Sequence, residues 1–171
     1  MRRERQVDRP KFHGDRDMLT IGVDDDLIGE AFERAGAVVM GRRMFDHGEG
    51  PWGDDPPFHK PVFVLTHEPR EPLVKRGTTF TFVTDGIGSA LERAIAVAGD
   101  KDVSIAGGAQ MIQQYLKARL LDEIQIHIVP ILIGGGVRLF DRLGTEPPIE
   151  LEPMSVVEGR GVAHLRFRPV S

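Results

Sequence analysis

The spacing of apolar residues changes repeatedly along this chain and predicts strands and helices in alternation. Apolar positions from Ile87 follow the i, i+3, i+4, i+7, i+8 and i+11 pattern, which predicts an amphipathic helix over 88–98. Short uninterrupted apolar runs at 37–40, 62–65 and 103–105 predict buried strands, because strands covered on both faces lose their polar alternation. The centre of the chain therefore alternates between the two kinds of element.

Other segments extend this alternation. A helix is expected after the acidic run at 24–26, with Gly36 as its end. Another helix is expected to open at 42–47, and a further one to span 110–120. The helix at 110–120 is expected to bury five residues. These are Met111, Ile112, Tyr115, Leu116 and Leu120.

The C-terminal third has a different character. The apolar stretch at 124–133 predicts a long β segment bent at Pro130, and 150–170 predicts two antiparallel strands joined at 158–161. Alternating strands and helices followed by a hairpin indicate a three-layer α/β/α domain, with a mostly parallel central sheet and an antiparallel edge. The whole chain, 1–171, is expected to form this single domain.

Composition narrows the classes of function. The chain has 22 basic and 26 acidic residues, a formal net charge of −4, so no basic field favours nucleic acid or an anionic membrane. It lacks cysteine, which excludes disulfides, a cysteine nucleophile and a cysteine zinc site, and its six histidines lack metal-ligand spacing. The polar start has no signal-peptide core, and the longest apolar stretch, 128–137, is broken by proline and glycine. We therefore expect a cytoplasmic protein without a metal, nucleic acid or membrane partner.

Two glycine-bearing segments stand where a predicted strand turns into a helix. The first is AVVMGRRMFD at 37–46, and the second is VSIAGGAQMIQQYL at 103–116. A helix that begins at glycine offers uncapped backbone N–H groups and a positive dipole end to an anion. Two such sites on one domain indicate an extended ligand with several phosphates.

These residues carry a family resemblance that runs from about Asp24 to the C-terminus. Four motifs come in order: Gly-Arg-Arg at 41–43, VLTHEP at 64–69, the glycine pair at 107–108, and VPILIGGGVRLFD at 129–141. In them the chain resembles the dihydrofolate-reductase-like fold. More narrowly, it resembles the reductase family typified by the C-terminal half of bacterial riboflavin-biosynthesis deaminase/reductases, the RibD C-terminal domain. The absent P-C-x-x-C segment excludes the zinc deaminase half of such enzymes.

The resemblance implies an NADPH-dependent reductase and names the residues that would bind the cofactor. Arg42 and Arg43, after Gly41, suit a 2′-phosphate or pyrophosphate, and Thr66 with His67 would contact the adenosine side. The pyrophosphate would lie on the helix start formed by Gly107, Gly108, Ala109 and Gln110. The competing interpretations are solvated arginines, a plain turn and a bare helix cap.

Catalysis and substrate are less defined. A pterin substrate would need a buried carboxylate to fix and protonate its ring. The resemblance to dihydrofolate reductases implies that this acid lies on the helix before the first motif, which makes Asp25, Asp26 or Glu30 the candidate, unless the aspartates only cap that helix. The substrate would be a small heterocycle, either the riboflavin-pathway 5-amino-6-(5-phosphoribosylamino)uracil type or a pterin. The alternative is a non-catalytic nucleotide-binding protein or dimeric scaffold.

The N-terminal segment departs from the resemblance. Members of the family open with an apolar strand and an S-L-D-G loop, and residues 1–23 show neither. That strand is normally central to the sheet. A sheet without it would leave an edge to cover, so we expect a homodimer formed through 124–133 and 163–170.

Overall fold

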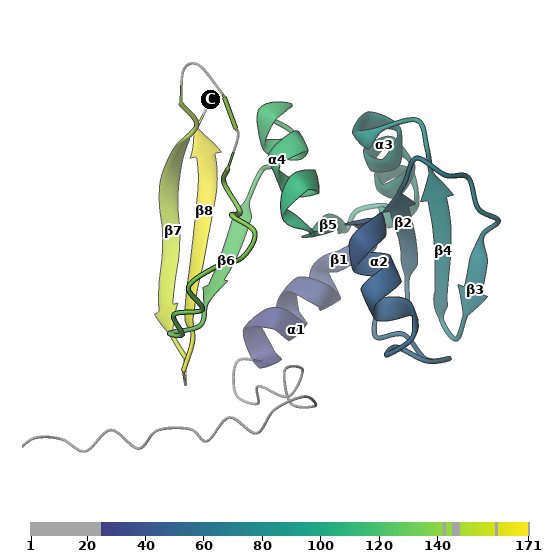
Figure 1. Cartoon of the computed structure of the whole chain (residues 1–171), viewed down its shortest axis with the longest axis horizontal. Coiled ribbons are helices and arrows are strands. Elements are labelled where there is room, and N and C mark those ends of the chain that lie inside the picture. The colour runs from purple at the N-terminus through teal and green to yellow at the C-terminus, as the bar shows by residue number, and fades with distance from the viewer. Residues whose placement is uncertain (1–24, 142, 145–147, 160, 171) are drawn as a thin grey trace, which may run out of the picture.

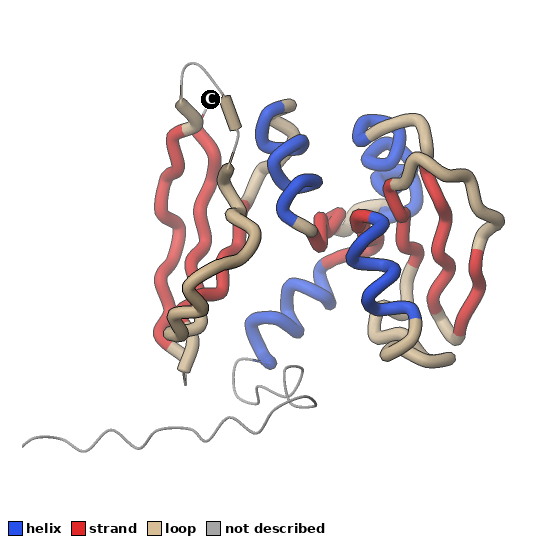
Figure 2. Tube along the Cα trace, in the orientation of Figure 1, coloured by secondary structure: helices blue, strands red, loops and turns tan. Residues whose placement is uncertain are grey.

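The computed structural model describes residues 25–141, 143–144, 148–159 and 161–170, and side chains from Gly29 onward. Figures 1 and 2 show helices and strands alternating along the first part of the chain and a separate group of strands at its end. In order, the elements are α1 (Asp25–Arg34), β1 (Ala35–Gly41), α2 (Arg42–Glu49), β2 (Pro61–Leu65), β3 (Leu73–Lys75), β4 (Thr78–Val83), α3 (Ile87–Ala98), β5 (Asp102–Gly107), α4 (Ala109–Lys117), β6 (Ile124–Ile128), β7 (Glu150–Glu158) and β8 (Ala163–Val170).

The larger sheet has five strands in the order β3-β4-β2-β1-β5. β1 pairs in parallel with β2 on one side and β5 on the other, β4 is parallel to β2, and only β3 runs antiparallel. The four parallel strands therefore end at the same edge. Their last residues are Gly41, Leu65, Val83 and Gly107.

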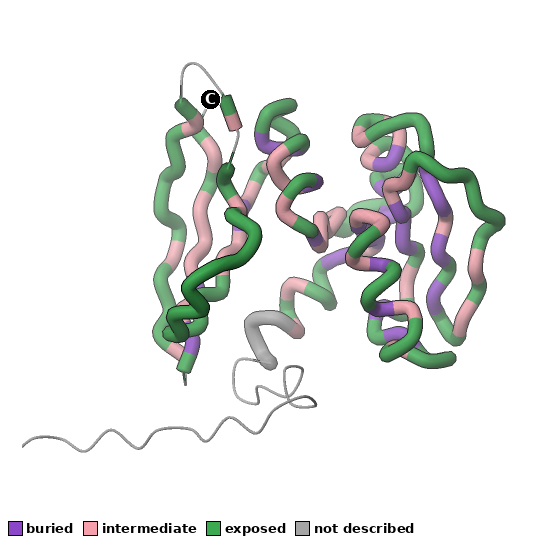
Figure 3. The backbone as a smooth tube through the Cα atoms, in the orientation of Figure 1, coloured by how far each residue is buried: buried purple, intermediate pink, exposed green. Residues whose placement is uncertain are grey.

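The core lies on both faces of this sheet because alternate residues of β1 point to opposite sides. Val39 belongs to a buried cluster with alanines of α3 and with Tyr115 of α4. Val38 and Met40 belong to the opposite cluster, which includes Phe45 of α2 and aromatic residues of β4. Figure 3 shows the buried residues concentrated in these strands. Helices thus cover both faces, as the three-layer prediction requires.

The smaller sheet is antiparallel, in the order β6-β8-β7. β8 is its middle strand, paired with β6 from Ile124↔Phe167 to Ile128↔Ala163 and with β7 along its whole length. All but one residue of β7 are exposed. The predicted C-terminal hairpin is confirmed, but its outer strand lacks the inward and outward alternation of a half-buried strand.

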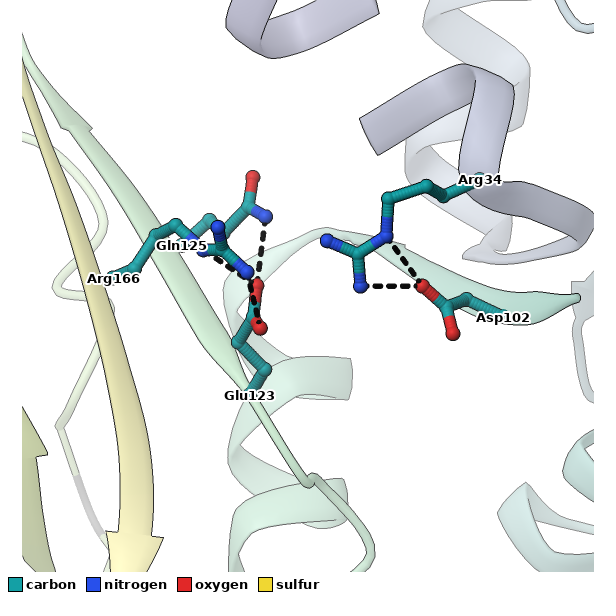
Figure 4. A network of polar contacts seen from close by, with 5 residues as sticks. All are labelled: Arg34, Asp102, Glu123, Gln125 and Arg166. Atoms are coloured by element: carbon teal, nitrogen blue, oxygen red, sulfur yellow. Dashed lines mark hydrogen bonds and ion pairs between the residues drawn. The ribbon is translucent and has the colours of Figure 1, made fainter. Parts of the chain in front are cut away.

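β5 and β6 are edge strands of the two sheets, and within the described residues no strand pairs with the free edge of either. We call the region between these two free edges the seam, and charged side chains lie on both sides of it (Figure 4). Arg34 bonds Asp102 at the start of β5, with Nη2 2.6 Å from Oδ2, and Arg166 of β8 bonds Glu123 just before β6, with Nη2 2.7 Å from Oε2. Hydrogen bonds from Arg166 and Gln125 and the charge of Arg34 lower the pKa of Glu123.

Some predicted boundaries are wrong. Gly36 does not end α1 but lies inside β1, where an added Cβ would come 2.6 Å from the carbonyl oxygen of Ala98. The β segment predicted at 124–133 ends at Ile128, because the chain leaves the sheet before Pro130. Leu120 lies beyond the end of α4 and is exposed, although the other four predicted residues of that helix are buried or half-buried.

Candidate functional site

The two glycine motifs meet at the carboxyl edge of the parallel strands. Met40 pairs with Gly107 across β1 and β5, so Gly41 lies beside the glycine pair. A Cβ on Gly41 would come 3.6 Å from the oxygen of Gly107 and 3.7 Å from the nitrogen of Gly108. α2 and α4 therefore begin next to each other, at the edge where ligands gather in open α/β sheets.

The start of α4 has the form of an anion cradle. Gly108 is its N-cap, and its oxygen accepts hydrogen bonds from the N–H groups of Met111 and Ile112 at 3.0 and 3.2 Å. No described side chain caps this end and its first turn has no acid, so the N–H groups of Ala109 and Gln110 are available to a ligand.

The glycine at 108 is not required by the protein's own packing. Its φ of −80° suits any residue, and a Cβ built there meets no atom of the described residues within 4 Å. Gly107 differs, because its φ of +109° lies in the region that only glycine adopts readily. The space beside Gly108 is therefore open on the protein side, as a pyrophosphate site requires.

The start of α2 is built in the same way but carries positive charge. Gly41 is its N-cap, no side chain caps it, and its first turn has no acid. Arg42 is half-buried and places Nε 2.6 Å from Oδ1 of Asp46 one turn later. Arg43 is exposed and has no ion-pair partner among the described residues. Both predicted arginines thus lie at the edge shared with α4.

α3 offers a useful contrast. It also follows a parallel strand and also has a glycine N-cap, Gly86. Its start is, however, flanked by Asp85, which accepts hydrogen bonds from Ser89 Oγ at 2.8 Å and Arg93 Nη2 at 2.9 Å. The bond from Ser89 and the charge of Arg93 lower the pKa of Asp85. This helix start has its own carboxylate, whereas α2 and α4 have none.

Thr66 and His67 follow β2 at the same edge. The N–H group of Thr66 donates to the oxygen of Val83 at the end of β4, and its Oγ1 accepts from the N–H group of Glu68 at 3.1 Å. The turn is therefore fixed by its own hydrogen bonds. His67 is exposed and Thr66 half-buried, so both can be reached by a ligand lying across β2.

Sequence reasoning missed Arg70, which lies beyond this turn. Its guanidinium group lies over the rings of Phe45 and Phe82, with the carbon 5.3 and 5.0 Å from their centroids. It also binds Glu49 through two nitrogens at 3.2 and 2.7 Å. This pairing raises the pKa of Arg70 and lowers that of Glu49. A loop arginine carries no periodic signal, so only the fold reveals these partners.

The predicted catalytic acids are only partly visible. Asp25 and Asp26 are the first two residues of α1, but their side chains lie outside the described part of the structure. Glu30 is exposed, and its charge contributes to a raised pKa of Arg166 in the smaller sheet. The described side chains therefore bring no predicted acid to the glycine cradles.

A cavity of about 460 Å³ lies elsewhere, at the amino ends of β1 and β2. Two of its lining residues are lysines whose ammonium groups bond carbonyls at the end of α1: Lys60 donates to Phe32 and Ala35, and Lys101 to Glu33. Burial and the nearby charge of Lys101 lower the pKa of Lys60. These lysines cap a helix C-terminus, which accounts for their presence without a ligand.

Among the described residues, no group of three or more histidine, aspartate or glutamate residues is placed to hold a metal ion. No helix in the described part of the chain is long and apolar enough to cross a membrane.

Comparison with known proteins identifies the family. The family model of the RibD C-terminal domain matches residues 10–162, which is most of the chain. The chain belongs to the RibD C-terminal domain family. Membership supports a reductase-type function, and reductases of this family use a nicotinamide cofactor.

Two curated proteins are similar to this chain in sequence. The uncharacterized protein YwjB of Bacillus subtilis (strain 168) is 25% identical over 131 residues, covering 77% of this chain and 73% of YwjB. YyaP of the same organism, also uncharacterized, is 28% identical over 114 residues, covering 60% of this chain and 58% of YyaP.

Solved structures confirm the dihydrofolate-reductase-like α/β fold. A putative riboflavin biosynthesis protein from Shewanella sp. PV-4 superposes with a TM-score of 0.71 at 24% identity, covering 92% of this chain and 84% of that one. RibD of Acinetobacter baumannii gives a TM-score of 0.65 at 16% identity, covering 88% of this chain and 51% of that one. This chain therefore spans about half the length of that RibD.

Proposed function

We propose that this protein is a cytoplasmic, NADPH-dependent reductase that transfers a hydride to a small heterocyclic substrate. One observation carries the proposal: α2 and α4 begin side by side at the strand edge, each with a glycine N-cap and without a capping side chain. The open space at Gly108 fits a pyrophosphate, because the protein itself leaves the position of a Cβ there empty.

In this proposal, different residues bind different parts of the cofactor. The N–H groups of Ala109 and Gln110 bind the pyrophosphate, the turn at Thr66 and His67 contacts the adenosine side, and Arg42 and Arg43 bind the 2′-phosphate. NADPH supplies the hydride when bound, and the protein orients it toward the acceptor. The substrate is a riboflavin-pathway pyrimidine or a pterin, with Asp25 or Asp26 as the acid for a pterin ring.

A titration of NADPH and NADH by nicotinamide fluorescence tests the cofactor. We expect NADPH to bind more tightly, because a charge-assisted contact to the 2′-phosphate is worth about 1.5–3 kcal/mol. Replacing Arg42 and Arg43 together with Ala should weaken NADPH binding more than NADH binding. Equal losses of affinity for both nucleotides would mean that these arginines do not bind the 2′-phosphate.

Gly108→Val tests the pyrophosphate site. The side chain would enter the open space where the ligand is proposed to lie, so we expect cofactor binding to be lost while the circular dichroism spectrum stays that of the wild type. Gly88→Val is the matched control, because Gly88 in α3 also has no atom within 4 Å of a built Cβ. Unchanged affinity in Gly108→Val would mean that the glycine only caps a helix.

The alternative is a nucleotide-binding protein or scaffold without turnover. An NADPH-oxidation screen against pyrimidine and pterin substrates separates the two: binding without oxidation of NADPH by any of them favours the alternative. The described side chains favour neither substrate, since no acid among them lies at the cradles.

We also propose a homodimer, with a surface that overlaps the one predicted from sequence and extends to β7. β8 is paired on both edges, so it can contribute a sheet face but not a strand edge to this interface. Many exposed apolar side chains lie on 128–137 and on β7, including Leu132, Ile133 and Val137 at 101%, 84% and 82% exposure. An apolar surface of this extent on a small domain favours a protein partner.

A further inference from the structure

The charges on α2 run against its helix dipole. Arg42 and Arg43 lie in the first turn, where the dipole end is positive, whereas Asp46 and Glu49 follow toward the negative end. A charge near the helix end of like sign is unfavourable. Such a helix needs opposite charges from elsewhere at both ends.

At the C-terminal end, the described residues supply that compensation. Glu49 is bound by both terminal nitrogens of Arg70, and the Lys75 ammonium group donates to the carbonyl oxygens of Glu49 and Gly53 at 3.2 and 2.5 Å. Arg70 is in turn held over Phe45 and Phe82. Two cations from the sheet and its loop therefore neutralise this end.

At the N-terminal end, Asp46 is the only described residue that compensates the two arginines. It contacts Arg42 through a single hydrogen bond to Nε, and both side chains are partly exposed, at 33% for Arg42 and 46% for Asp46. Within the described residues, the terminal nitrogens of Arg42 have no partner, and neither has Arg43. This end thus has room for a further anion. Asp46 already neutralises part of the positive charge of Arg42 that would attract that anion.

We propose that Asp46 is a specificity-determining residue that limits the preference for NADPH over NADH, an inference that rests on the proposed function. The 2′-phosphate must share Arg42 with the Asp46 carboxylate or displace it, and it must approach that negative charge. NADH, which has a hydroxyl in place of the phosphate, leaves the Arg42–Asp46 ion pair intact. Asp46 therefore weakens binding of the phosphorylated cofactor and leaves the other unchanged.

The test measures dissociation constants of NADPH and NADH for the wild type, Asp46→Asn, Arg42→Ala and the double variant. Asp46→Asn keeps the size of the side chain and removes its charge. We expect it to tighten NADPH binding by about three- to tenfold, the range for one partly exposed charge, with NADH unchanged. In the Arg42→Ala background, the Asp46→Asn change should lose most of this effect.

Glu49→Gln is the matched control, because it removes the same charge one turn further along α2, where Arg70 is the partner. It should leave the ratio of the NADPH and NADH dissociation constants close to that of the wild type. Adenosine 2′,5′-bisphosphate and AMP serve as probes without a nicotinamide, and the same shift should appear between them. The gain in Asp46→Asn should shrink as salt is raised, because the effect is electrostatic.

Weaker NADPH binding in Asp46→Asn would overturn the inference, since it would mean that Asp46 positions Arg42 for the phosphate. An equal shift for both cofactors, or none, would also overturn it while leaving the proposed function in place. If the wild type binds neither dinucleotide, the proposed function fails and this inference fails with it.

Discussion

The two sheets of this protein differ in how completely they are covered. β1 has helices packed against both faces, and its apolar side chains from Ala37 to Met40 are fully buried. β7 has comparable apolar content, with Leu151, Met154 and Val156 all exposed. The same kind of side chain thus supports the core in one sheet and faces solvent in the other. Within the described residues, the parallel sheet is covered on both faces, whereas the antiparallel sheet leaves apolar side chains of its outer strand exposed.

The sharpest test of this contrast compares a substitution in the core that packs on the larger sheet with one on the exposed strand of the smaller sheet. Phe45→Ala removes a fully buried ring from the larger sheet's core and should lower the free energy of unfolding by about 3–5 kcal/mol. Val156→Thr, on the exposed strand, should stay within about 0.5 kcal/mol. Urea denaturation at a protein concentration below that of any association measures both. Similar losses of unfolding free energy in the two variants would contradict the difference in burial between the two sheets.

A charge introduced into the exposed apolar segment 128–137 should weaken the proposed homodimer. Leu132 is fully exposed, and Leu132→Glu should shift a homodimer toward monomer, since burying one leucine is worth about 1.5–3 kcal/mol. Light scattering at micromolar concentration should give twice 19.0 kDa for the wild type and a lower mean mass for the variant. Lys117→Glu, on the exposed face of α4, is the control and should leave the mass unchanged. A wild-type monomer would contradict the proposed dimer.

On the covered side, the Tyr115 hydroxyl adds a hydrogen bond to the packing of α4 against α3. Tyr115 is fully buried, its hydroxyl donates to the oxygen of Ile87 at 2.9 Å, and burial raises its pKa to about 12. Tyr115→Phe should lower stability by about 1 kcal/mol at neutral pH. An unfolded tyrosine ionises near pH 10. The wild type should therefore lose this advantage as the pH rises from about 10 toward 12, which denaturation curves of both variants would reveal.

The smallest expected effect concerns the charged pair beside the smaller sheet. Because the pKa of Glu123 is lowered in the folded protein, the carboxylate stabilises the fold above its unfolded pKa, and this contribution disappears as the pH falls through the folded value. Glu123→Gln should cost about 1 kcal/mol or less at pH 7. The gap between wild type and variant should close below about pH 4, near the ordinary glutamate pKa. A gap independent of pH would mean that the loss is not electrostatic.

The parallel part of the fold could be predicted because its signals are local. Continuous apolar runs such as 62–65 and the helical spacing at 88–98 match β2 and α3 within one residue at each boundary. β3, with only three residues and one apolar side chain facing the core, carries no comparable pattern. The apolar residues at 129–133 continue the pattern of β6, yet the chain leaves the sheet there, because pairing with β8 ends at Ile128.

The candidate site divides in the same way. The glycine-to-helix transitions at Gly41 and Gly108 could be predicted because a glycine before an apolar helix pattern has a direct geometric meaning. Their adjacency could not, since it depends on the pairing of β1 with β5, two strands more than sixty residues apart. The ion pair of Arg70 with Glu49 also depends on tertiary structure, because the two residues are 21 positions apart. The pair of Arg42 with Asp46 does not, since the two residues are four positions apart on one helix.

The seam between β5 and β6 has a consequence for amide hydrogen exchange. Backbone N–H groups on an edge that no strand covers exchange with solvent much faster than those inside a ladder. Any strand that inserted at the seam would protect amides on both flanking strands at once. If amide exchange slows in 102–107 and in 124–128 at the same time, the two sheets have joined into one. If the two segments exchange at independent rates, the two sheets unfold as separate cooperative units.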